Sequence, residues 1–130
     1  MKREMFFAIT GIVGTLFGLA FLLVPEMSLR MYGVPTEPHN LMQARYFGSA
    51  LLGIGRVSFL ARNTQEPVAI RALLTAALVS NIAGCVISVS AAGRLQNNMA
   101  WLSVAIYGAF AIAGAYYLFA PSQRSKGLPA

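Results

Sequence analysis

Long apolar stretches alternate with short polar breaks along the chain, and this pattern is the strongest signal in the sequence. The apolar stretches cover residues 5–24, 41–61, 68–92 and 99–120. A helix rises about 1.5 Å per residue, so about 20 residues are enough to cross the roughly 30 Å hydrocarbon core of a bilayer. The pattern therefore predicts an all-α fold for the single domain of residues 1–130, an integral membrane four-helix bundle with antiparallel, up-and-down connections.

Residues that favour helix ends stand at the predicted breaks. Pro25 ends the first stretch, because proline has no N–H to continue a helix. Residues 26–32 are predicted to form a short helix that lies in the membrane interface and stops at Gly33. Asn40 is predicted to cap the second membrane-spanning helix, and Gly93 to terminate the third.

The composition favours a membrane protein over a soluble one. Apolar residues form 57% of the chain and charged residues 11%, a balance that would leave a soluble protein with large exposed apolar patches. The net charge of +6 does not indicate nucleic-acid binding, since the basic residues are scattered over the ends of the apolar stretches. Lys2, Arg3, Arg62, Arg124 and Lys126 fall at one end of the predicted bundle, whereas Arg30 and Arg94 fall at the other. By the positive-inside rule, this asymmetry predicts that both termini are cytoplasmic.

Small residues recur within every predicted span and are expected to let the helices approach one another closely. In lipid, helix association depends on close packing and hydrogen bonds, because apolar surface gains nothing by leaving an apolar solvent. The predicted helix-packing residues are Gly14, Gly18, Gly48, Ala76, Ser80, Gly84 and Ser88. They allow two interpretations. The small faces pack the four helices against one another, or one face, on the first or third span, binds another copy or a partner protein.

Two arginines, Arg45 and Arg56, fall inside the second apolar stretch. They are eleven residues apart, about three helical turns, and are therefore expected on one face of the helix. A structural interpretation makes them snorkelling side chains with acidic partners. Those partners would be Glu26 or Glu37 for Arg45, and Glu4 or Glu66 for Arg56 or Arg71. A functional interpretation makes their face a binding surface for an anion or a lipid phosphate.

A further polar residue, Asn81, lies in the middle of the third stretch, where its amide must find a partner within the bundle. Tyr107 on the fourth stretch is a candidate partner. The alternative is that the amide contacts a ligand or lines a water-filled cavity. The candidate ligand-binding residues are therefore Arg45, Arg56, Asn81 and Tyr107.

The sequence lacks the residues that most kinds of catalytic site require. The chain has no aspartate, and its four glutamates lie outside the apolar stretches, so a proton-coupled exporter would lack an intramembrane carboxylate. His39 is the single histidine and Cys85 the single cysteine, so no intrachain disulfide, metal site or haem site is expected. No cofactor and no catalytic residue are predicted. The sequence therefore disfavours an enzyme. The enzymatic alternative that remains is one in which the arginines hold a lipid phosphate.

The order of motifs in the first half of the chain carries a family resemblance. A glycine-rich first stretch closes in Leu23-Val24-Pro25, Tyr32-Gly33-Val34 follows, and Arg45-x-x-Gly48 precedes Leu51, Leu52 and Gly53. This order resembles small bacterial four-span membrane proteins of uncharacterised function and is similar to DoxX-like proteins. The resemblance implies a four-helix bundle in a bacterial inner (cytoplasmic) membrane, with an accessory role beside membrane redox proteins.

These observations lead to two main expectations for function. The first is a non-enzymatic subunit that self-associates as a homo-oligomer or accompanies a larger membrane complex. The alternative is a small-anion or lipid/quinone-binding protein or transporter that uses the arginine-lined face of the second span. An enzyme acting on a lipid-soluble substrate is the third. In every case the lipid bilayer is the expected partner and nucleic acid is not.

Overall fold

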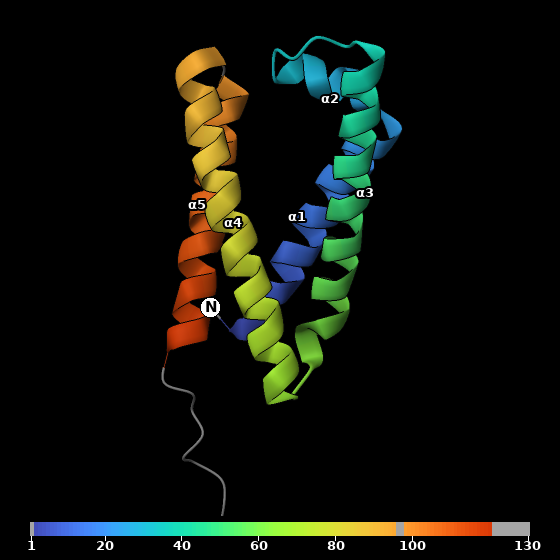
Figure 1. The fold of residues 1–130 in the computed structure, drawn as a ribbon. Helices are drawn as coiled ribbons and strands as arrows, with labels where there is room; N and C mark the ends of the chain where they lie inside the picture. Colours follow the sequence, from blue (N-terminus) through green and yellow to red (C-terminus); the bar gives the residue numbers. More distant parts are fainter. Residues whose placement is uncertain (1, 96–97, 121–130) are drawn as a thin grey trace, which may run out of the picture.

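The chain folds into helices throughout almost all of its described length. The computed structural model describes residues 2–95 and 98–120, and within these ranges there is no strand. The elements, drawn in Figure 1, are α1 (Arg3–Leu23), α2 (Pro25–Met31), α3 (Pro38–Leu60), the 3-10 turn η1 (Ala61–Asn63), α4 (Pro67–Leu95) and α5 (Asn98–Phe119). The predicted all-α class is confirmed.

Three of these helices, α1, α4 and α5, are long and apolar enough to cross a membrane. The expectation of four such helices is therefore corrected to three. Helix α3 has 23 residues but falls short in apolar character. Its first turns carry the polar residues His39, Asn40 and Gln43, and its later turns contain Arg45 and Arg56. The prediction counted residues 41–61 as a span despite the two arginines noted within them.

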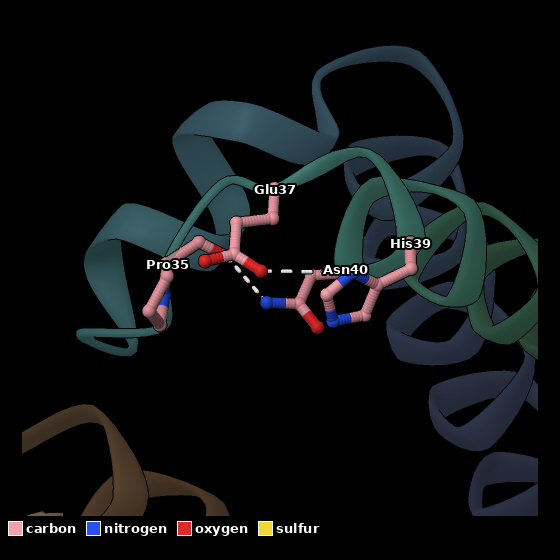
Figure 2. A network of polar contacts seen from close by, with 4 residues as sticks. All are labelled: Pro35, Glu37, His39 and Asn40. Atoms are coloured by element: carbon pink, nitrogen blue, oxygen red, sulfur yellow. Dashed lines mark hydrogen bonds and ion pairs between the residues drawn. The ribbon is translucent and has the colours of Figure 1, made fainter.

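The observed helix ends differ from several predicted ones. Helix α3 begins at Pro38, with Glu37 as its N-cap residue, so Asn40 lies within the first turn and does not cap it. Its side-chain amide instead donates to the carbonyl of Pro35 at 2.8 Å, while His39 Nδ1 lies 3.6 Å from Glu37 Oε2 (Figure 2). Helix α4 continues past Gly93 to Leu95, which corrects the predicted stop. Arg124 and Lys126, used to predict orientation, lie outside the described residues.

The short helix predicted after Pro25 is present as α2, and its end is specified by local chemistry. Gly33 has a φ of 68°, in the left-handed region that glycine adopts without steric cost. The N–H of Gly33 donates to Arg30 O, and the N–H of Val34 donates to Leu29 O, both at 3.0 Å. This is the Schellman pattern of a helix C-terminus, and Val34 packs against Leu29 as that motif favours.

Helices α1 and α3 form a tightly packed antiparallel pair, called here the α1–α3 pair. A methyl group added at Gly18 would lie 2.6 Å from the backbone nitrogen of Leu52, and one at Gly48 would lie 2.7 Å from Gly18 O. One added at Gly55 would lie 2.6 Å from the backbone nitrogen of Thr15. The two backbones therefore touch directly, because these positions carry no side chain.

Helices α4 and α5 form the second pair, the α4–α5 pair, in which a side chain fills the gap beside a glycine. A methyl group added at Gly84 would lie 2.6 Å from the ring of Tyr107. Ser88 is buried farther along α4, whereas Ala76 and Ser80 are exposed. Each step of four residues rotates the position about 40° around a helix, so a long row of small residues changes its facing from one end to the other.

The two pairs meet at one end and diverge toward the other, which gives the molecule the shape of a wedge (Figure 1). At the closed end, Phe6 and Phe7 of α1 form a buried cluster with Ile70 and Leu74 of α4. The ring of Phe6 lies 5.5 Å from that of Tyr117 on α5. At the open end, α2 runs across the end of the α1–α3 pair. Its backbone is separated there from the start of α5.

A candidate ligand-binding cavity between the helix pairs

A partly open cavity of about 200 Å³ lies between the two helix pairs. Helices α1, α3, α4 and α5 and the loop after α2 all contribute to its wall. The lining residues used below are Thr10, Phe17, Phe21, Tyr32, Phe47, Asn81, Ser103, Ile106, Tyr107 and Phe110. The volume exceeds the roughly 150 Å³ of an apolar protein cavity that holds benzene, so a planar ring fits.

Aromatic rings form much of this wall and pack on one another. Phe21 lies edge-on to Phe47 with ring centroids 5.1 Å apart, which ties α1 to α3. The ring of Tyr32 lies 5.9 Å from that of Phe21. Phe110 lies opposite, on α5, with its ring 6.2 Å from Phe6 at the closed end. The cavity therefore presents faces and edges of rings, which favour a flat apolar guest.

The open end is bridged by Tyr32 and Ser103. The Tyr32 hydroxyl and Ser103 Oγ are 2.9 Å apart, a hydrogen bond between the loop after α2 and helix α5. The two residues are 71 positions apart in the chain. The bond thus connects the α1–α3 pair to the α4–α5 pair on the side where their backbones diverge.

A few polar residues line this apolar space. The hydroxyl of Thr10 is buried and has no hydrogen-bond partner among the described residues. Leaving such a group unpaired costs about 1–3 kcal/mol, so a site of this kind favours an occupant that supplies an acceptor or a donor. Asn81 Nδ2 donates to Ala77 O at 2.7 Å, one turn earlier on α4. That bond uses one of its two amide protons and leaves the second for a guest.

The four residues proposed from the sequence as ligand contacts separate into two groups. Asn81 and Tyr107 both line the cavity. Arg45 and Arg56 are exposed on α3 and are not part of its wall. Within residues 2–95 and 98–120, neither arginine lies within 4.0 Å of a carboxylate, so the expected pairs with glutamates are not formed.

Sequence reasoning missed several residues of the cavity, above all Thr10, Phe17, Phe21 and Tyr32. The first three share a face of α1, at spacings of seven and four residues that a helix brings onto one side. This row of one threonine and two phenylalanines could have been recognised from the sequence, as the glycines of the same helix were. Tyr32 could not, because its position depends on the Schellman end of α2 and on the distant Ser103.

Comparison with known proteins gives one match. A family model described as a domain of unknown function (DUF8292) matches residues 8–127. The chain belongs to this family. No curated protein and no solved structure matches the chain. Membership in DUF8292 does not support the resemblance to DoxX-like proteins, which stays a prediction.

Proposed function

We propose that the protein is a four-span membrane protein that binds a lipid-soluble ring compound of the quinone type in the cavity between its helix pairs. The observation that carries the proposal is an aromatic-lined cavity whose wall includes Thr10, a residue with a buried hydroxyl that has no hydrogen-bond partner among the described residues. A quinone offers a flat ring for the aromatic walls and two carbonyl oxygens that accept hydrogen bonds. Its apolar tail would leave through the open end of the wedge into the surrounding lipid.

The direction of the helices supports four crossings, although three helices have the apolar character of membrane spans. Helices α1 and α4 both start at the closed end, where Arg3 Nη2 donates to Thr64 O at 3.4 Å. A chain that crosses in α1 must therefore return before it crosses again in α4. Helix α3 is long enough to make that return, and its packing along α1 shields its glycine face from lipid.

The distribution of charge supports cytoplasmic termini. Lys2, Arg3, Arg62 and Arg71 lie at or near the closed end, and Arg56 lies about one turn inside it. Arg30, Arg45 and Arg94 lie toward the other end. By the positive-inside rule the closed end faces the cytoplasm, and we assign the protein to a bacterial inner membrane. An accessory role beside membrane redox proteins, as the DoxX-like resemblance implies, fits a quinone-type ligand.

A binding assay on the intact chain tests the proposal. The purified protein in lipid nanodiscs is heated with and without a short-tailed benzoquinone, and its unfolding temperature is recorded. Binding of the quinone to the folded state should raise this temperature in a concentration-dependent way. Ile106→Trp should abolish the increase by filling the cavity, whereas Ile112→Trp, on the exposed side of the same helix, should keep it. Equal responses from both variants, or no response of the wild type, would refute the proposal.

Self-association is the second candidate, and a groove on α4 favours it. Ala72, Ala76 and Ser80 lie exposed along this groove, which is also lined by Arg71 and Val79. Small exposed side chains allow another helix to approach closely in lipid. Mass measurement of the protein released from nanodiscs should then show a dimer that Ala72→Leu dissociates, since Ala72 lines this groove and not the cavity. A monomer at every protein-to-lipid ratio would remove this candidate.

A further inference from the structure

Two arginines from different helices share a groove at the open end of the molecule, and this groove has no lining residue in common with the inter-pair cavity. Arg30 of α2 and Arg45 of α3 both line this groove, whose volume is about 500 Å³. Glu26, one turn before Arg30 on α2, lines it as well. None of these three side chains forms an ion pair within 4.0 Å in the part of the chain that the structure describes. Their charges therefore stay available to an occupant.

The groove lies where a spanning helix ends. Helix α1 stops at Leu23, and α2 begins at Pro25 and runs across the end of the pair (Figure 1). The neck of a lipid, between headgroup and acyl chains, lies at this depth beside a protein whose helices cross the bilayer. Leu23 and Met27, both strongly exposed, provide apolar surface next to the charged groups.

The three charges match one kind of headgroup. A guanidinium group binds phosphate oxygens through a planar array of N–H donors, and two of them surround a phosphate better than one. A carboxylate beside them would repel a second anionic group but attract an ammonium group. We propose that this groove binds an aminophospholipid, with its phosphate on Arg30 and Arg45, its amine on Glu26 and an acyl chain along Leu23 and Met27.

The proposal explains why a glutamate lies in a groove with two arginines without pairing to either. A site for a simple anion would gain nothing from Glu26, since its negative charge opposes the ligand. A zwitterionic headgroup uses all three side chains. The site is separate from the quinone-type cavity, so the two proposals fail or succeed independently.

Lipid retention by the full chain provides the test. The protein is reconstituted with equal amounts of phosphatidylethanolamine, phosphatidylcholine and phosphatidylglycerol, then released from detergent for native mass spectrometry. Wild type should retain phosphatidylethanolamine above the other two. The double variant Arg30→Gln/Arg45→Gln should retain all three about tenfold less, because charge-assisted hydrogen bonds to the phosphate are lost. Arg94→Gln removes an exposed charge from α4 outside the groove and should retain lipid as wild type does.

Glu26→Gln separates the amine contact from the phosphate contact. It should lower the retention of phosphatidylethanolamine to that of phosphatidylcholine, while retention of phosphatidylcholine stays at the wild-type level because the phosphate contacts remain. All the replaced side chains are exposed, and far-UV circular dichroism verifies that the variants stay folded. The wild-type measurement is a test even without the variants, since equal retention of the three lipids would overturn the proposal. So would displacement of the lipid by millimolar inorganic phosphate, or an Arg94→Gln loss as large as that of the double variant.

Discussion

The hydroxyl of Tyr32 lies 2.9 Å from Ser103 Oγ and joins the two helix pairs across the open end of the wedge. The closed end is held by a cluster of aromatic and aliphatic side chains, including Phe6 and Leu74. The two ends are thus held together by different means. A packed cluster resists separation along its whole surface, whereas a hydrogen bond is lost when one atom is removed.

Removing the Tyr32 hydroxyl should loosen the open end. For Tyr32→Phe we expect the free energy of unfolding to fall by about 1 kcal/mol, the usual net value of one such bond. Unfolding of the protein in mixed micelles by a denaturing detergent measures this change. Tyr46→Phe is the matched control, because Tyr46 is 68% exposed and its removal breaks no hydrogen bond that the structure shows. A loss equal in both variants would contradict a bridging role for Tyr32.

A methyl group at the contact of α1 with α3 should be far more harmful than one on the surface. Gly18→Ala brings a carbon to 2.6 Å from the backbone of Leu52, so the pair must separate, and we expect a loss of about 1–3 kcal/mol. Gly53→Ala adds the same group to α3 with no atom within 4 Å. There we expect a gain of about 0.5–1 kcal/mol, because alanine favours a helix over glycine. Thermal unfolding followed by circular dichroism distinguishes the two.

Replacing Thr10 with valine should have opposite effects on stability and on ligand binding. Thr10→Val keeps the shape but removes a buried hydroxyl without a partner, and the ligand-free protein should gain about 1 kcal/mol. The same change should weaken binding of the quinone probe, which loses a hydrogen-bond donor. Thr75→Val, on an exposed face of α4, should change neither quantity. Tighter quinone binding in Thr10→Val would show that the hydroxyl opposes the ligand.

The ring of Tyr107 depends on the empty space beside Gly84. In Gly84→Ala the new methyl group would lie 2.6 Å from that ring, so the ring must move, and it borders the cavity. We expect weaker quinone binding with a smaller loss of stability than in Gly18→Ala, because a side chain shifts more easily than a backbone. Gly93→Ala has no atom within 4 Å and provides the control. Titration of the quinone against each variant gives the affinities.

Local sequence chemistry was enough to predict the helical segments, although the predicted ends at Asn40 and Gly93 were wrong. Pro25 and Gly33 specify their ends through backbone geometry that depends on near neighbours alone, and α2 forms between them. The glycines of α1 and α3 were recognisable as packing residues because their spacing fits one helix face. Arg45 and Arg56 also share an outward side, but whether that side meets lipid or a cavity depends on which helix pairs with α3.

Features that depend on the placement of whole helices were not predictable. The prediction began the second span at residue 41 and so left out the polar residues of the first turn of α3, including His39 and Asn40. The cavity arises because Phe6 and Tyr117 hold the pairs together at one end while the other end diverges. The angle between the helix pairs is set by side chains that are far apart in the chain, so no short sequence motif predicts it.

Under the proposed function, the filled closed end also determines the route by which a lipid-soluble ligand would reach Asn81. Because Phe6, Phe7 and their neighbours fill the junction there, a ligand of the proposed kind would have to enter from the half of the bilayer nearest to α2. Under the proposed function, a ligand dissolved in that leaflet would enter laterally between the helix pairs, with its apolar tail still in the lipid. One dissolved in the opposite leaflet must first flip across the membrane, so uptake in asymmetrically loaded vesicles would be one-sided.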